Sequence, residues 1–268
     1  MTLPSRMLLV GCGNMAGSML TGWLRGGISP DTFTIVDPYL ENAPDGVRLL
    51  REMPDETFDA VQLGIKPQML ADAAPSIRPV LTGEATLFSI LAGVELSTLS
   101  DRFPDAGGVV RVMPNLSVAL GKSPIALAAE DLGEAQKAMA EDLMTPLGQA
   151  EWIGEDTFDL VTALAGSGPG FVYRVIDALG SAAASLGLDE AQAQRLALAT
   201  VEGASALAAQ SEHSPAELAR RVASPGGVTQ AGLDTLDADN RLVNLMTDTL
   251  RDASARSAEM SKEAREST

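Results

Sequence analysis

The stretch RVASPGGVTQAGLDTL, residues 221–236, places a serine and a threonine hydroxyl on either side of two consecutive glycines. Proline cannot donate a backbone hydrogen bond, and ordering two glycines costs conformational entropy. Such a break in a helical region is either a plain turn between helices or a place where the backbone approaches a ligand. Because Val228 and Thr229 restart the helix at once, backbone N–H groups without helical partners are expected there.

Near its beginning the chain carries a second candidate site, the pattern Gly11-x-Gly13-x-x-Ala16 between an apolar run and a helical pattern. In a dinucleotide fingerprint the first glycine permits a tight turn, the second lets the backbone approach a pyrophosphate, and a small third residue allows close helix–strand packing. The pyrophosphate lies at the helix N-terminus, where free N–H groups and the helix dipole favour anions. The alternative is a tight strand–helix turn without a ligand. The residues predicted to bind the cofactor here are Gly11, Cys12, Gly13, Asn14 and Met15.

Asp37 ends the next predicted strand, TFTIVD, where a dinucleotide fold positions the carboxylate that binds the ribose 2′-hydroxyl. The same carboxylate would repel a 2′-phosphate, and no arginine follows closely in DPYLENAP. Asp37 therefore favours NADH over NADPH, unless it is simply a solvated loop residue.

Three further loops, GIKP, LAGV and RVMPN, leave predicted strands in the same direction. Ligands of a doubly wound sheet bind outside the carboxyl ends of its strands, so these loops would face the cofactor. Ordinary strand exits are the alternative. The cofactor-binding residues predicted in these loops are Ile65, Lys66, Pro67, Ala92, Gly93 and Asn115.

The elements that must hold these residues differ between the two halves of the chain. Up to about residue 150, short β-rich runs alternate with helical patterns, which indicates a parallel sheet with helices on both faces. The predicted strands are Met7–Val10, Phe33–Val36, Ala60–Leu63, Thr86–Leu91 and Val109–Val112. The later part is helical in pattern, with predicted helices at Phe158–Leu164, Phe171–Leu186, Glu190–Gln210, Pro215–Val222 and Arg241–Ala258. We predict a Rossmann-type α/β domain over residues 1–154 and an all-helical domain over residues 155–268.

The predicted helix Glu190–Gln210 is small or apolar around most of its circumference. Such a helix is usually buried on several sides, which a domain this small rarely achieves alone. We therefore expect a homodimer formed through the helical domain, and a higher oligomer of dimers stays open. The last residues, SKEAREST, are expected to fray.

Composition narrows the possible partners and location. The chain has 268 residues, 46% of them hydrophobic and 21% charged, and its net charge of −17 would repel nucleic acid. Its apolar runs are too short for a membrane span. The single cysteine, Cys12, excludes an internal disulfide and fits a reducing cytoplasm. We expect Cys12 to be structural rather than reactive, and we expect no metal site.

Taken in order, the motifs VGCGNMAGSML, GIKP, LAGV, RVMPN, TALAGSGPGFVY and RVASPGGVTQAGLDTL resemble those of the pyrroline-5-carboxylate reductases. The resemblance covers nearly the whole chain. It implies a Rossmann domain followed by a helical dimerisation domain, and reduction of 1-pyrroline-5-carboxylate to proline by NADH or NADPH. The family mostly favours NADPH, whereas Asp37 predicts a preference for NADH here.

The resemblance also implies roles for residues of the helical domain. Thr229 would bond the imine nitrogen of the substrate and act in catalysis. Because a threonine hydroxyl is a weak acid, we expect it to orient the substrate and relay a proton, and a capping role is the alternative. The residues implied in substrate binding are Glu155, Thr162, Ser224, Gly226, Gly227, Val228 and Thr229.

Two other functions are alternatives to this one. Dehydrogenases of the same architecture that act on 3-hydroxyacids use a lysine on a helix of the second domain. Here the only lysine of the predicted helical domain is Lys262, and the only histidine, His213, is expected in a loop before a helix. A non-catalytic dinucleotide sensor would have no need of the Ser-Pro-Gly-Gly-Val-Thr segment.

Overall fold

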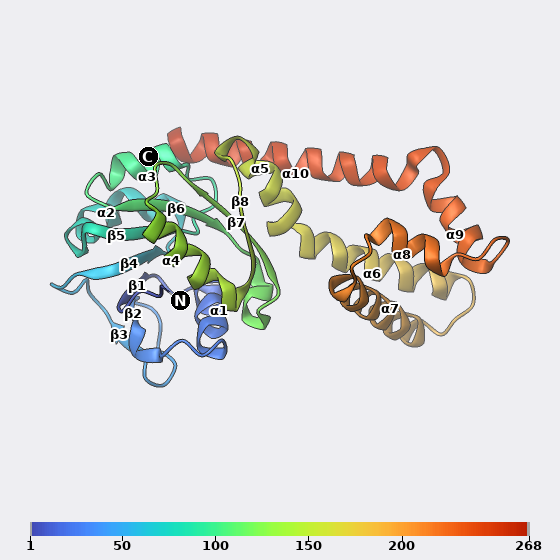
Figure 1. Ribbon diagram of the computed structural model, residues 1–268, viewed down its shortest axis with the longest axis horizontal. Helices are drawn as coiled ribbons and strands as arrows, with labels where there is room; N and C mark the ends of the chain where they lie inside the picture. Colours follow the sequence, from blue (N-terminus) through green and yellow to red (C-terminus); the bar gives the residue numbers. More distant parts are fainter. Residues whose placement is uncertain (1, 267–268) are drawn as a thin grey trace. The chain divides into compact units, whose positions relative to one another are not determined.

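The computed structural model describes residues 2–266 (Figure 1). By its internal contacts the chain forms two compact units. The first contains residues up to Ser167 together with those from Asp252 onward, and the second runs from Gly168 to Arg251. The predicted boundary between residues 154 and 155 is defined by sequence pattern and stays a prediction.

The first unit is built on one eight-stranded sheet with the order β3-β2-β1-β4-β5-β6-β7-β8 (Figure 1). Neighbouring strands are parallel except β6 and β7, which are antiparallel. The order around β1 and β4 is that of a doubly wound dinucleotide-binding sheet, so the predicted fold class is confirmed. The strands are β1 (Met7–Val10), β2 (Phe33–Val36), β3 (Arg48–Leu50), β4 (Phe58–Leu63), β5 (Leu81–Ser89), β6 (Gly108–Met113), β7 (Ser123–Ala129) and β8 (Gly148–Trp152).

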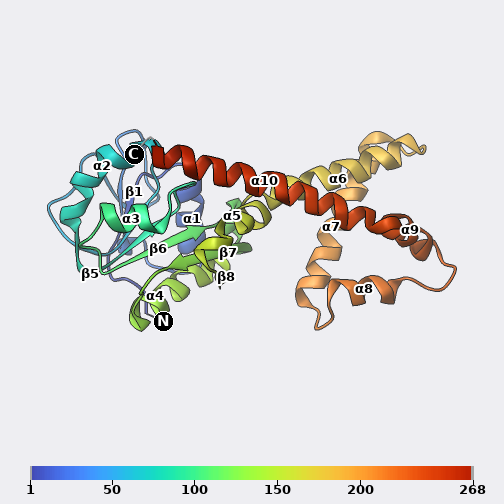
Figure 2. The same ribbon diagram turned by 90° about the horizontal axis from the view of Figure 1, so that it is seen from above.

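Helices cover both faces of this sheet, and Figure 2 gives a second view of them. On one face α1 (Asn14–Arg25) and α4 (Glu134–Met144) bury a shared apolar cluster. Trp23 of α1 stacks on Phe33 with a centroid separation of 5.3 Å and donates through its indole N–H to the carbonyl of Leu143, 2.7 Å away. On the other face the cluster is formed by α2 (Leu70–Ile77), α3 (Leu96–Arg102) and α5 (Phe158–Val161). Strands β1 and β2 are therefore buried on both sides, which explains their continuous apolar runs.

The second unit is helical. It holds α6 (Gly168–Ser185), α7 (Glu190–Gln210), α8 (Pro215–Val222), α9 (Val228–Asp237) and the first part of α10 (Arg241–Glu266). Asp189 and Ser214 cap α7 and α8 by accepting from the N–H groups of Gln192 and Glu217. These caps explain where the two helices begin, and the predicted bounds of both helices are confirmed. The predicted helix Phe158–Leu164 differs, because α5 passes into a π-helix at Thr162–Gly166.

The prediction that the last residues fray is wrong for residues 261–266, which continue α10. Ser261 is only 3% exposed. Residues 267–268 lie outside the described part. No helix of the described residues is long and apolar enough to cross a membrane.

Candidate functional site

The turn after β1 requires glycine at position 11. Gly11 has a φ of +84°, and its N–H donates to the carbonyl of Val36, 2.9 Å away. An added Cβ would lie 3.0 Å from the backbone of Gly64, which itself begins the loop after β4. The strand order of the sheet reverses between β1 and β4. This contact therefore places the ends of two strands together at the edge where a ligand is expected to bind.

The residue at position 13 leaves open space instead. Gly13 is the N-cap of α1, and a Cβ added there would meet no atom within 4 Å. No side chain caps this helix, and its first hydrogen bond runs from Gly17 to the carbonyl of Gly13. The N–H groups of Asn14 and Met15 therefore have no helical partner. An open glycine followed by free N–H groups fits a dinucleotide pyrophosphate.

Asp37 ties the glycine turn to the loop after β2. Its Oδ2 accepts from the N–H of Cys12 at 2.9 Å, and its Oδ1 accepts from Tyr39 at 2.8 Å and Leu40 at 3.1 Å. Burial acts to raise the pKa of Asp37, but these hydrogen bonds and the charge of Arg51 outweigh it, so the pKa lies below its ordinary value. The carboxylate stays ionised, and Oδ2 keeps an acceptor position for a further donor.

Arg51 is a residue that sequence analysis missed. No arginine follows Asp37 closely along the chain, but β3 pairs with β2 and brings Arg51 beside it. The guanidinium of Arg51 donates to the carbonyl oxygens of Asp37, at 3.0 Å, and of Leu40 and Glu41. Arg51 thus holds the loop after Asp37 in place. Recognising the three-residue strand β3 would have been needed to find it.

A cavity of about 680 Å³ brings several predicted cofactor residues together. Asp37 and Arg51 line it on one side, and residues of the loop after β4 line it on the other. The predicted site residues that it contains are Gly11, Asp37, Ile65 and Lys66. Asp37 stands where this fold places a ribose-binding carboxylate, so the cavity beside it lies where the adenosine part of a dinucleotide is expected.

The remaining predicted cofactor residues lie in neighbouring loops. Pro67 begins the short helical turn after β4, Ala92 is exposed, and Gly93 is buried. Asn115 is 4% exposed, and its amide binds the protein itself: Nδ2 donates to the carbonyl of Ala165 at 2.9 Å, and Oδ1 accepts from the N–H of Ser117. Asn115 therefore fixes the π-helix to the end of β6, and its cofactor role stays a prediction.

Cys12 is half-buried, and its thiol has a pKa raised to about 11 by burial and by the charge of Asp37. The thiolate is the reactive form of cysteine, so this thiol is unreactive near neutral pH. That property agrees with the expected structural role.

Glu155 forms a partly buried ion pair within the first unit. Its Oε1 accepts from Arg111 at 2.6 Å and from the N–H of Leu96, the first residue of α3, at 3.0 Å. The Arg111 guanidinium lies over the ring of Phe158, 3.7 Å from its centroid. Oε2 is buried without a partner among the described residues.

Thr162 begins the π-helix, and its hydroxyl donates to the carbonyl of Phe158 at 2.9 Å. π-Helices are rare and are frequent at functional sites. Like Glu155, Thr162 stays a predicted substrate-binding residue.

The substrate loop predicted from RVASPGGVT forms a turn in the second unit. Gly226 has a φ of +71°, and the N–H of Gly227 donates to the carbonyl of Ser224 at 2.9 Å. A Cβ at Gly227 would collide with the hydroxyl of Ser224. Both glycines are therefore required by the turn itself, and the N–H of Gly227 is used within it.

Helix α9 begins directly after this turn. Gly227 is its N-cap, without a side-chain cap, and its first hydrogen bond joins the N–H of Ala231 to the carbonyl of Gly227. The N–H groups of Val228 and Thr229 therefore lack helical partners. Thr229 is exposed, and its hydroxyl has no hydrogen-bond partner among the described residues. An uncapped helix start beside a free hydroxyl suits a small ligand that carries a carboxylate and a second polar atom.

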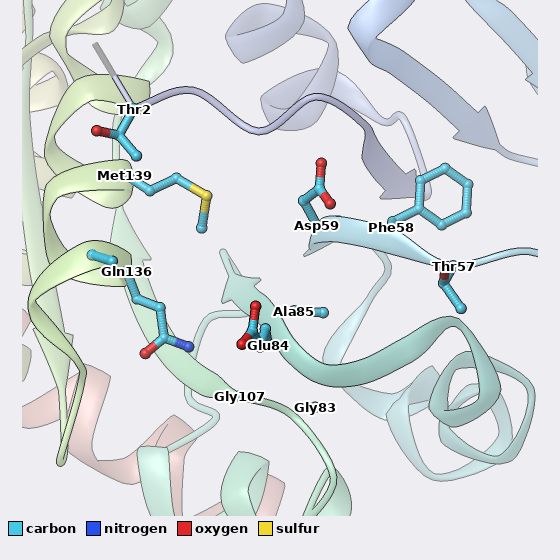
Figure 3. Close-up of a pocket in the computed structure, with 11 residues that line it drawn as sticks. Thr2, Thr57, Phe58, Asp59, Gly83, Glu84, Ala85, Gly107, Gln136 and Met139 are labelled. Atoms are coloured by element: carbon cyan, nitrogen blue, oxygen red, sulfur yellow. The ribbon is translucent and has the colours of Figure 1, made fainter.

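A larger cavity, of about 830 Å³, lies at the opposite edge of the sheet, near the beginnings of β4 and β6 (Figure 3). Asp59 and Glu84 contribute carboxylates to it, together with Gln136 and Met139 of α4. It contains none of the predicted site residues. Ligands of parallel sheets bind at the carboxyl ends of the strands, so the cavity beside Asp37 is the better candidate.

Comparison with known proteins finds relatives that match nearly the whole chain. A family model for pyrroline-5-carboxylate reductase dimerisation matches residues 155–260. Pyrroline-5-carboxylate reductase 2 of Bacillus subtilis is 35% identical, with 95% of this chain and 94% of the relative covered. Pyrroline-5-carboxylate reductase of Pseudomonas aeruginosa is 34% identical, with 96% and 97% covered.

Solved structures agree with these relatives. A pyrroline-5-carboxylate reductase from Coxiella burnetii superposes with a TM-score of 0.89 at 28% identity, covering 96% of this chain and 98% of its own. A pyrroline carboxylate reductase from Plasmodium falciparum with NADP bound has a TM-score of 0.81 at 23% identity, with the same coverage. The second likeness shows the fold alone.

Proposed function

Because this chain belongs to the pyrroline-5-carboxylate reductase family, we propose that it reduces 1-pyrroline-5-carboxylate to L-proline with a nicotinamide cofactor. A hydride passes from C4 of the dihydronicotinamide to the imine carbon, the cofactor becomes oxidised, and the imine nitrogen gains a proton. The observation that carries this proposal is the pairing of two sites in one chain. One is the glycine turn with Asp37 in the first unit, and the other is the uncapped start of α9.

The start of α9 binds the substrate carboxylate. The N–H groups of Val228 and Thr229 point away from the helix, and the helix dipole adds to their attraction for an anion. Gly226, whose added Cβ would meet no atom within 4 Å, leaves the approach open. Ser224 supplies a further hydroxyl donor.

Thr229 orients the imine. Its hydroxyl is free of intramolecular hydrogen bonds among the described residues, so it is available to the ring nitrogen. A threonine hydroxyl is too weak an acid to supply a proton alone at neutral pH. Thr229 therefore holds the nitrogen in position and relays a proton from water.

NADH is the preferred cofactor. Asp37 is held ionised by three N–H donors, and it would repel a 2′-phosphate while accepting from a 2′-hydroxyl. The guanidinium of Arg51 lies close by but binds three backbone carbonyls of the same loop. It therefore supports Asp37 rather than offering a free cation to a phosphate.

The helical domain, from residue 155 onward, forms a homodimer. The family match over residues 155–260 supports this assembly, and so does the surface of the second unit. In the single chain Leu186, Leu207 and Tyr173 are 89%, 73% and 68% exposed. Exposed apolar surface of this kind marks an interface between subunits. The single cysteine supports action in the reducing cytoplasm.

One assay separates this function from its rivals. NADH oxidation is followed with 1-pyrroline-5-carboxylate and without substrate, and NAD⁺ reduction is followed with a 3-hydroxyacid. The proposed function predicts turnover with the cyclic imine only. Turnover with the 3-hydroxyacid alone would identify a different dehydrogenase, and cofactor binding without any turnover would identify a sensor.

A further inference from the structure

The last turns of α10 lie directly on the loop that follows β5. This loop, Leu91–Glu95, contains the predicted cofactor residues Ala92 and Gly93. A Cβ added to Gly93 would lie 3.1 Å from the carbonyl oxygen of Met260 and 3.3 Å from the backbone nitrogen of Ser261. A side chain at Gly93 would therefore require the helix backbone to shift by a few tenths of an ångström.

Two polar contacts bind the same helix turns to other elements of the first unit. Ser257 donates from its hydroxyl to Asp159 of α5 at 2.7 Å. Arg265 forms an ion pair with Glu95, the N-cap of α3, with 3.2 Å between Nη1 and Oε2. Figures 1 and 2 both place the C-terminal end of α10 beside α3. Residues 257–265 of α10, called here the C-terminal brace, thus contact the loop, the start of α3 and α5.

The loop has few hydrogen bonds of its own. Its turn is closed by a long contact of 3.5 Å from the N–H of Val94 to the carbonyl of Leu91, and Gly93 adopts a φ of +75°. At its far end the N–H of Leu96 is bound by Glu155. Glycine in such a turn has wide conformational freedom, so an external contact is needed to restrict it.

We propose that the C-terminal brace positions the Ala92–Gly93 backbone for the nicotinamide cofactor, with Ser261 and Arg265 as positioning residues. This inference rests on the proposed function, because it assumes that the loop faces a bound cofactor. A loop that only partly populates its binding conformation weakens affinity by that fraction. Loosening the brace should therefore weaken cofactor binding even in the absence of the second substrate.

The test is NADH binding to the full-length protein without imine, measured by fluorescence titration. Ser261→Leu places a larger side chain at a buried position whose backbone lies against the loop, and Lys262→Leu is the matched control at the next, exposed position. Ser261→Leu should raise the Kd for NADH about tenfold, which corresponds to about 1.4 kcal/mol. Lys262→Leu should bind NADH as the wild type does. A folded Ser261→Leu protein with the wild-type Kd would overturn the proposal.

The ion pair supplies a second, milder test if Ser261→Leu does not fold. Arg265→Glu places two carboxylates together and should raise the Kd for NADH, and adding Glu95→Arg should restore it. An unchanged Kd in Arg265→Glu overturns the inference, while a rise that the second change reverses supports it. If the wild type binds neither NADH nor NADPH, the proposed function fails together with the inference.

Discussion

At Thr229 the effect of a substitution on catalysis can be measured separately from its effect on folding. Its side chain makes no hydrogen bond within the described residues and is exposed at the first turn of α9. Thr229→Ala therefore removes no intramolecular hydrogen bond, and alanine is the better helix former by about 0.5 kcal/mol. The change should leave the thermal midpoint of unfolding unchanged or slightly raised. Any loss of activity would then reflect a slower reaction and not a loss of folded protein.

The size of that loss follows from the role proposed for the hydroxyl. Losing a well-placed transition-state hydrogen bond and assisted proton transfer lowers kcat about 100-fold, or about 2.7 kcal/mol. The N–H groups that bind the carboxylate are backbone groups and remain, so KM for the imine should change much less than kcat.

Three variants make the test specific, with steady-state NADH oxidation as the assay. Thr229→Ser keeps the hydroxyl and should retain much of the activity. Thr229→Val keeps the shape but not the hydroxyl and should lose as much as Thr229→Ala. A valine variant as fast as the wild type would refute the reasoning, because the hydroxyl would then contribute nothing beyond the start of a helix.

Further predictions concern the cofactor site, the buried ion pair and the assembly. Asp37→Ser should narrow or invert the preference for NADH, measured as the ratio of kcat/KM values; a wild type that prefers NADPH would contradict the role of Asp37. The folded pKa of Asp37 is depressed, so its stabilising contribution is fully present above the ordinary aspartate value and is lost as pH falls through the lower folded value. Acid titration of the folded protein should therefore give Asp37 a midpoint below that of an ordinary aspartate. Glu155→Ala leaves the buried Arg111 without its anion and should destabilise the protein by about 1–3 kcal/mol, unlike exposed Asp156→Ala, as compared by thermal unfolding. Light scattering should give a dimer, and a stable folded monomer at micromolar concentration would contradict the proposed interface.

Strands β1 and β2, whose apolar residues are continuous, were predicted from sequence, whereas β3, β7 and β8 were not. MLLV and FTIV are buried on both faces, and their composition shows it. β8, with the sequence GQAEW, alternates between half-buried and exposed positions and contains no β-branched residue. β3 has three residues and lies at the edge of the sheet. Local composition carries too little signal for such strands, because neighbouring strands and not their own residues hold them in place.

The same limit applies to the site. The glycine turn and Asp37 form a local pattern, and the structure places both at one edge of the sheet. The approach of Arg51 to Asp37 depends on the pairing of β3 with β2, which no local pattern encodes. The contact of Gly93 with α10 joins residues far apart in the chain, so a glycine that resembled a cofactor residue also has a packing requirement.

The most direct test of the proposed reaction follows the hydride itself. NADH carrying deuterium at both C4 positions is incubated with the protein and 1-pyrroline-5-carboxylate, and the product is analysed by mass spectrometry and NMR. The proposed reaction predicts proline with one deuterium on the former imine carbon, C5, formed at the rate of NADH oxidation. Proline without deuterium at C5, or no NADH oxidation above the rate without substrate, would contradict it.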